Sequence, residues 1–194
     1  MGSLNLLILG PQGAGKGTQA ARISGEYGIP HISTGEILRD NMARGTALGD
    51  RVRPIVEAGD LVPDELMVEL IRDRLSRGDT VPGFVLDGFP RTLAQAEALE
   101  AMLKEIGRAL DAVLVLEIDE ERAVARLLKR AEDEGRSDDT PEVIRNRLDN
   151  YRRNTAPLVE WYRARDKVVP VNGEGTIDEV FLQIRKALDH MGNR

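Results

Sequence analysis

Short apolar runs alternate along the chain with stretches in which apolar residues recur at every third or fourth position. The runs at residues 4–9, 29–32, 84–86, 112–118 and 168–171 have the length and composition of buried strands. Helical spacing is clear at residues 93–106, after Glu120-Glu121, from Thr140 to about Arg165 with a bend at Pro157, and at residues 176–190. Strands that alternate with helices predict the α/β class, with a parallel sheet covered by helices on both faces.

Two segments do not fit this alternation. Residues 34–77 are too many for one connection, and they predict several short helices broken at Gly45, Gly49 and Gly59. Residues 131–140 form a polar, charged stretch between two predicted helices. Both segments could be ordinary surface insertions or mobile flaps. Because no linker, repeat or low-complexity tract interrupts the chain, we expect a single domain over residues 1–194.

Composition and charge exclude several classes of function. The 194 residues are 41% hydrophobic, which is enough for one core, and the formal net charge is -6. An overall basic field for nucleic acid or an anionic membrane is therefore absent, and any anion site must come from local clustering. The absence of cysteine excludes disulfides, thiolate metal sites and cysteine nucleophiles. No apolar run has the length of a membrane span, so we expect a cytoplasmic protein with no nucleic-acid or membrane partner.

The first apolar run leads into a glycine-rich loop with the sequence GPQGAGKGT at residues 10–18. It matches the P-loop pattern of glycine, four residues, glycine and lysine. Glycines let backbone N–H groups turn toward phosphate oxygens, the following helix adds its positive end, and Lys16 supplies a full charge. Gly17 stands where a serine or threonine would contact Mg²⁺, which puts direct metal ligation by the loop in doubt. The pattern predicts a nucleoside triphosphate site; a glycine-rich turn without a ligand is the alternative.

Three further motifs narrow the kind of P-loop protein. They are STGEILR at residues 33–39, LDGFPRT at 86–92 and GRSDD at 135–139. Together with the loop, they make the chain resemble the adenylate kinase family from residue 4 to about residue 188. The resemblance implies a P-loop three-layer fold with a five-stranded parallel sheet, a small helical AMP-binding flap at residues 33–62 and a short lid at residues 130–140. Adenylate kinases are themselves a known example of closure by such a lid.

The resemblance also implies an activity and a set of site residues. It implies reversible, Mg²⁺-dependent phosphoryl transfer from ATP to AMP, giving two ADP, in purine nucleotide salvage and energy homeostasis, by a monomer. The catalytic residues would be Lys16, Asp87, Arg91, Arg130, Arg136 and Arg147, with Asp87 orienting the water shell of Mg²⁺ rather than binding the metal directly. The ATP contacts would be Gly13, Ala14, Gly15, Lys16, Gly17, Thr18, Arg130 and Gly175. The AMP contacts would be Thr34, Arg39, Asp60, Leu61, Val62, Gly88, Phe89, Pro90, Arg91, Gln95, Arg136 and Arg147.

Selectivity for AMP depends on two of these residues. The hydroxyl of Thr34 and the amide of Gln95 match the adenylate kinase pattern and can read the adenine edge by hydrogen bonds. A UMP/CMP kinase is the nearest alternative enzyme. A nucleotide sensor without turnover is an alternative from another class, and a slow ATPase could be a side reaction. Taken alone, Gln95 could be an exposed helix residue and Gly175 a glycine at a helix start.

Other charged residues have simpler interpretations. Arg126 lies one helical turn before Arg130 and could support it, and the match favours Arg147 over Arg145 as the substrate contact. We expect Arg152 and Arg153 to form solvated ion pairs. For His31, packing or a local hydrogen bond is favoured over catalysis. Asp138 and Asp139 could equally tether the lid arginines or cap the next helix.

Overall fold

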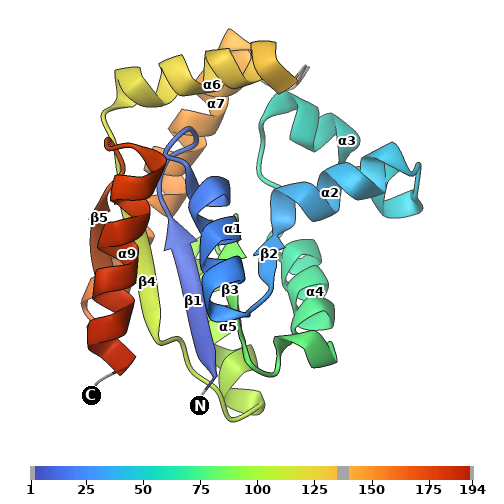
Figure 1. Cartoon of the computed structure of the whole chain (residues 1–194). Helices are drawn as coiled ribbons and strands as arrows, with labels where there is room; N and C mark the ends of the chain where they lie inside the picture. The colour runs from blue at the N-terminus through green and yellow to red at the C-terminus, as the bar shows by residue number, and fades with distance from the viewer. Residues whose placement is uncertain (1–2, 135–139, 193–194) are drawn as a thin grey trace.

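The computed structural model describes residues 3–134 and 140–192, and its centre is a sheet of five parallel strands. The strands are β1 (Leu4–Leu9), β2 (His31–Ser33), β3 (Gly83–Asp87), β4 (Ala112–Glu117) and β5 (Val168–Asn172), in the spatial order β2-β3-β1-β4-β5 (Figure 1). This confirms the predicted α/β fold. β2 begins two residues later than the pattern indicated, because Pro30 has no N–H to donate and only its carbonyl bonds to Val85.

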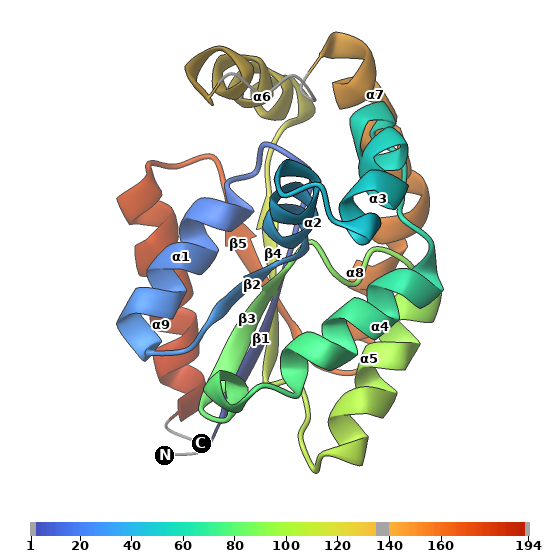
Figure 2. The same cartoon turned by 90° about the vertical axis from the view of Figure 1, so that its right-hand side faces the viewer.

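Helices cover both faces of the sheet. The α-helices of the described residues are α1 (Lys16–Tyr27), α2 (Thr34–Ala43), α3 (Ala47–Ala58), α4 (Asp64–Leu75), α5 (Leu93–Glu105), α6 (Glu120–Glu134), α7 (Pro141–Asn150), α8 (Pro157–Arg163) and α9 (Ile177–Gly192). Helices α1 and α9 lie on one face, and α4, α5 and α8 lie on the other (Figure 2).

The alternation of side chains along β1 explains why both faces are covered. Leu6 and Ile8 are fully buried in a cluster with residues of α1 and α9, whereas Leu7 and Leu9 belong to a cluster with residues of α4, α5 and α8. Because both faces of the strand are buried, it appears in the sequence as a continuous apolar run.

The segment that did not fit the alternation forms α2, α3 and α4, as predicted, but one of the predicted breaks is wrong. The chain turns at Gly45 and Gly59, which have φ angles of 62° and 77°. Gly49 lies inside α3, where a Cβ atom would stand 2.1 Å from the carbonyl oxygen of Asn41. This glycine therefore allows α3 to approach α2 closely and does not end a helix.

The helix predicted from Thr140 to about Arg165 is interrupted. Thr140 caps α7 by accepting a bond from Val143 N–H, and the chain passes at Tyr151–Thr155 through a π-helical turn. The N–H of Ala156 donates to Tyr151 O, and Pro157 then opens α8 at a position that needs no donor. The preceding charged stretch also differs from expectation, since α6 continues to Glu134.

Candidate nucleotide site

The P-loop joins β1 to α1 in a left-handed conformation that only glycine adopts easily. Gly13 and Gly15 have φ angles of 85° and 91°, and Gly15 stands directly before the first turn of α1. A Cβ atom on Gly13 would lie 2.4 Å from the carbonyl oxygen of Ala123, so the loop also packs tightly against α6. Lys16 donates a hydrogen bond of 3.0 Å to Pro11 O, which folds its side chain over the loop.

A cleft of about 610 Å³ extends from this loop between α2, α6 and α7. Its lining includes six cationic side chains, Lys16, Arg39, Arg91, Arg126, Arg130 and Arg147, and three carboxylates, Glu36, Asp60 and Asp87. The cleft is therefore net positive although the chain as a whole carries a net charge of -6. This is the local clustering that an anion site in an acidic protein requires.

The cleft brings together most of the residues predicted from the sequence. The predicted residues in its lining are Gly13, Gly15, Lys16, Gly17, Thr18, Thr34, Arg39, Asp60, Leu61, Val62, Asp87, Gly88, Pro90, Arg91, Gln95, Arg130 and Arg147. The side chains of Ala14 and Phe89 are buried beneath it. Gly175 lies before α9, outside this lining, and Arg136, Asp138 and Asp139 lie outside the described residues.

Mutual repulsion and burial perturb the ionisable groups of the cleft. Burial lowers the pKa of Lys16 to about 8; Asp87 opposes this shift, whereas Arg91 and Arg130 add to it. Burial also lowers the pKa of Arg91. For Asp87, burial acts to raise the pKa, but the hydrogen bond from His31 and the charges of Lys16 and Arg91 hold it below its usual range. Asp87 is therefore an anion at neutral pH.

Asp87 ends β3, and its surroundings fix its position. His31 Nε2 on the neighbouring strand lies 3.4 Å from Asp87 Oδ2, so the hydrogen bond of this histidine joins residues that are far apart in the chain. Gly88 follows with a φ angle of 85°, and a Cβ atom there would lie 2.4 Å from Thr34 Oγ1. Glycine is therefore required where the strand end meets the start of α2.

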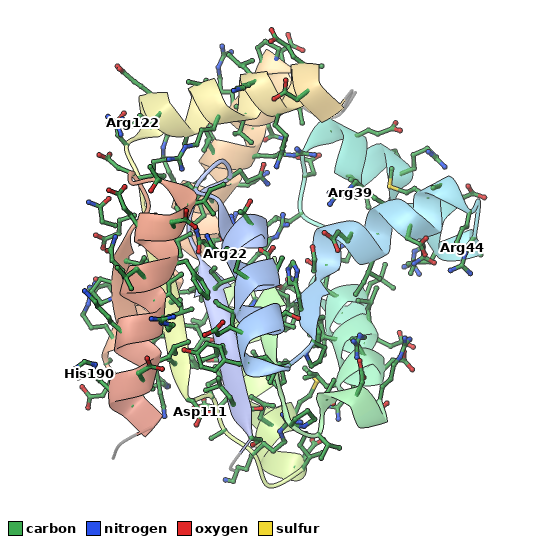
Figure 3. The ribbon with its side chains drawn as sticks, viewed as in Figure 1. Arg22, Arg39, Arg44, Asp111, Arg122 and His190 are labelled. Carbon is green, nitrogen blue, oxygen red and sulfur yellow. The ribbon has the colours of Figure 1, made fainter. Side chains whose placement is uncertain are left out.

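The arginines of the cleft come from separate elements. Arg39 projects from α2, and its guanidinium lies against Gly35, whereas Arg44 at the far end of the same segment is exposed and pairs with Asp40 (Figure 3). Arg91 Nε donates to Gly88 O at 2.9 Å. On α7, Arg147 is half-buried and lies in the lining of the cleft, whereas Arg145 is exposed. The choice of Arg147 as the substrate contact stays a prediction.

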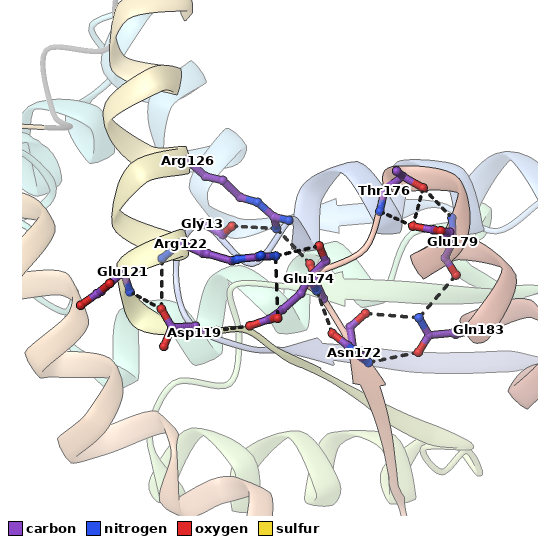
Figure 4. A network of polar contacts seen from close by, with 11 residues as sticks. Gly13, Asp119, Glu121, Arg122, Arg126, Asn172, Glu174, Thr176, Glu179 and Gln183 are labelled. Atoms are coloured by element: carbon purple, nitrogen blue, oxygen red, sulfur yellow. Dashed lines mark hydrogen bonds and ion pairs between the residues drawn. The ribbon is translucent and has the colours of Figure 1, made fainter.

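Arg126 has contacts that the sequence did not indicate. Its guanidinium donates to Gly173 O at 3.1 Å and reaches Gly13 O at 3.5 Å, so it joins α6 to the P-loop and to the loop before α9 (Figure 4). Beside it, Arg122 bonds to Glu174 in the same loop. Arg152 pairs with Glu120 and with Asp149 at the surface, as expected for an arginine outside the site.

Two polar groupings beside the predicted AMP residues were also missed. The amide of Gln95 bonds to Asp64, which stands 31 residues earlier in the chain. On α7, Asn146 Nδ2 donates to Ala58 O at 2.9 Å and to Asp60 Oδ1 at 2.8 Å, which anchors the loop at residues 59–62. Both contacts join segments far apart in sequence, so no local pattern could have revealed them.

Within residues 3–134 and 140–192, no group of three or more histidine or acidic residues is arranged to hold a metal ion. Among the same described residues, no helix is long and apolar enough to cross a membrane.

Comparisons with known proteins agree with the motifs. The family model described as adenylate kinase matches residues 8–167. A curated protein named adenylate kinase from Thermus thermophilus is 56% identical over 183 residues, which cover 94% of this chain and 96% of the relative. Adenylate kinases from Nocardioides sp. and Xanthomonas campestris are 50% and 46% identical, over 96% and 95% of this chain and 97% and 99% of the relatives. The chain therefore belongs to the adenylate kinase family.

Proposed function

We propose that this protein is an adenylate kinase that transfers the terminal phosphoryl group of ATP to AMP reversibly, giving two ADP. The observation that carries the proposal is that the P-loop, Arg91 after β3 and Arg147 of α7 all line the same cleft. A simple ATP-binding module needs only the first of these. The relatives named adenylate kinase support the same assignment.

The cleft divides into two phosphate subsites. The P-loop amides, Lys16 and Arg130 hold the ATP phosphates, while Arg39 and Arg91 hold the phosphate of AMP. The AMP base enters between Thr34, Gln95 and the loop at residues 60–62. We assign residues 33–62 to a nucleotide-monophosphate flap and residues 130–140 to a short lid. Arg136, in the lid, completes the phosphate contacts in this assignment, and Gly175 lies near the ATP base.

The chemistry requires positioning and positive charge more than a side-chain nucleophile. Phosphoryl transfer passes through a loose transition state in which negative charge spreads over the moving group. Lys16, Arg91 and Arg147 neutralise this charge from different sides and hold the donor and acceptor oxygens in line. Exclusion of water from the filled cleft favours transfer to AMP over hydrolysis of ATP.

The residues of the cleft fit Mg²⁺ bound together with ATP. Mg²⁺ usually keeps several water ligands and takes one or two carboxylates with the substrate phosphates, so it needs no protein cage. Asp87 is an anion beside the P-loop, and a Cβ atom on Gly17 would lie 3.7 Å from its Oδ2 atom. Asp87 and the exposed Thr18 would hold the water shell of the ion. When bound, Mg²⁺ neutralises charge on the phosphates.

The proposal includes the setting of the enzyme. We infer a monomer in the cytoplasm that acts in nucleotide salvage and energy homeostasis. The absence of cysteine suits a reducing compartment. Sedimentation of the purified protein would measure the oligomeric state.

The test is ADP formation from Mg²⁺-ATP with AMP, UMP, CMP or dTMP as acceptor, and with no acceptor. We expect rapid turnover with AMP alone. A preparation of the Lys16→Met variant, purified in the same way, should be inactive, which excludes a contaminating host kinase. Turnover with UMP or CMP would show that the acceptor is a different monophosphate, while phosphoryl transfer from ATP would remain the reaction. Binding of ATP without transfer to any monophosphate would overturn the proposal.

A further inference from the structure

The side-chain amide of Gln95 is held by two partners of opposite hydrogen-bonding character. Its Oε1 atom accepts a bond of 2.7 Å from the backbone N–H of Arg91, and its Nε2 atom donates a bond of 2.7 Å to Asp64 Oδ1. Gln95 is 2% exposed and lies in the lining of the cleft. The same carboxylate oxygen of Asp64 accepts a bond of 2.9 Å from the hydroxyl of Thr92.

These partners allow the amide only one orientation. A backbone N–H can only donate, and an ionised carboxylate can only accept. If the amide turned over, its oxygen would face the carboxylate of Asp64 and its NH₂ group would face the N–H of Arg91. Both bonds would then be lost and replaced by repulsion between like groups. Each amide atom keeps one unused bonding position, one acceptor on Oε1 and one donor on Nε2.

Thr92, at the start of α5, stabilises the same orientation of the Gln95 amide. Thr92 caps α5 by accepting a bond of 3.2 Å from Gln95 N–H, and its hydroxyl proton is given to Asp64. Asp64 opens α4 and is not part of the cleft lining. Its carboxylate therefore acts on the cleft only through the side chains that it holds.

We propose that Asp64 is a specificity-positioning residue that selects a 6-amino purine monophosphate over a 6-oxo purine monophosphate by fixing the orientation of the Gln95 amide. The proposal rests on the proposed function, in which Gln95 faces the acceptor base. The amino group of adenine donates a hydrogen bond, and a neighbouring ring nitrogen accepts one, which matches the fixed carbonyl and NH₂ group. A 6-oxo base presents an acceptor where adenine presents a donor, so it meets the fixed carbonyl oxygen with repulsion.

An amide free to turn over would accept both kinds of base. Asp64→Asn supplies that freedom with almost no change of shape, because the asparagine amide can accept from or donate to Gln95. The N–H of Arg91 and the hydroxyl of Thr92, which would lose its acceptor, still oppose the turn, but no carboxylate any longer forbids it. Since a site built to hydrogen-bond one group strongly rejects an analogue that lacks it, loss of the fixed orientation should appear mainly in the selectivity.

The experiment compares kcat/KM for AMP and for IMP, measured with Mg²⁺-ATP in the wild type, Asp64→Asn and Glu65→Gln. Glu65 is the next residue of α4, is exposed and also carries a carboxylate in the first helical turn. Glu65→Gln thus removes one negative charge from the start of α4, as Asp64→Asn does. We expect the ratio of AMP to IMP to fall about tenfold in Asp64→Asn, the effect of one hydrogen bond between well-matched groups, and to stay unchanged in Glu65→Gln.

The ratio separates selectivity from damage to the fold. A loss of folded enzyme lowers both rates equally, and thermal unfolding of each variant measures such a loss directly. An unchanged ratio in Asp64→Asn, with AMP still used by the wild type, would overturn the proposal for Asp64. No transfer to AMP by the wild type would instead overturn the proposed function. An equal fall in both variants would assign the effect to the helix charge and also reject the proposal.

Discussion

The charge of Lys16 predicts how the reaction depends on pH. Burial lowers its pKa from 10.5 to about 8, against the opposing effect of Asp87. In the proposed mechanism only the protonated ammonium holds the ATP phosphates. Because kcat/KM reports the ionisation of the free enzyme, kcat/KM for ATP should be constant near pH 7 and fall as pH rises through about 8, approaching tenfold for each further pH unit.

The same shift predicts a change in stability. Between pH 8 and 10.5 the unfolded chain keeps the Lys16 proton that the folded chain has lost. The unfolded state then binds more protons, so the free energy of unfolding gains a contribution that grows with pH across this window. The difference between the two pKa values corresponds to about 3 kcal/mol, which is the cost of keeping the ammonium charged in the cleft at neutral pH.

The assay is the initial rate of ADP formation at limiting concentrations of both ATP and AMP, so that the free enzyme is the reacting form, from about pH 6.5 to about pH 9.5. The control is Lys16→Arg, whose guanidinium stays protonated throughout, so its lower activity should show no decline near pH 8. A bound nucleotide should move the transition of the wild type to higher pH, because its phosphates favour the charged form. A flat wild-type profile, or the same decline in Lys16→Arg, would refute the reasoning.

Three further predictions test the geometry. Gly88→Ala should lower the free energy of unfolding by roughly 2 kcal/mol in denaturant titrations, since its φ angle is 85° and its Cβ atom would stand 2.4 Å from Thr34 Oγ1. Arg147→Ala should lower kcat by about 10²–10³, whereas Arg145→Ala on the exposed face should leave it unchanged; equal losses would contradict the assignment. Asn146→Ala removes the hydrogen bonds to Ala58 O at the end of α3 and to Asp60 in the 59–62 loop, so it should raise KM for AMP several-fold while kcat changes little, as steady-state rates would measure.

The centre of the sheet could be predicted because β1, β3 and β4 are buried on both faces and therefore appear as uninterrupted apolar runs, whereas the edge strands β2 and β5 are only partly buried. The ends of the strands were less predictable. Pro30 shortens β2 because it has no N–H to donate, and an apolar pattern carries no information on hydrogen bonding. The role of Gly49 depends on how closely α3 approaches α2 at Asn41. Such a distance is a property of packing between helices, so the sequence could offer only the more common role of glycine as a helix breaker.

Sequence motifs could predict the residues of the candidate site, but they could not predict the hydrogen-bond partners of those residues. The contact of His31 with Asp87 spans 56 positions and exists because β2 and β3 are neighbours in the sheet. The bond from Thr155 to the carbonyl of Arg91 spans 64 positions and depends on the π-helical turn after α7. Contacts of this kind follow from strand order and helix packing, which local sequence patterns do not contain.

The distribution of charge explains why the proposed reaction requires both nucleotides. The cationic side chains of the cleft come from α1, α2, α6, α7 and the loop after β3, so without substrate they repel one another across the cleft. Burial is the main cause of the lowered pKa values of Lys16 and Arg91, and the charges of neighbouring arginines lower them further. In the proposed function, the phosphates of ATP neutralise the cationic groups of α1 and α6, and the AMP phosphate neutralises those of α2 and the loop after β3. In this assignment each nucleotide neutralises only part of the cleft, so the cationic groups would act together on the transferring phosphoryl group only when both nucleotides are bound. Water brings no such charge, and this difference favours transfer over hydrolysis.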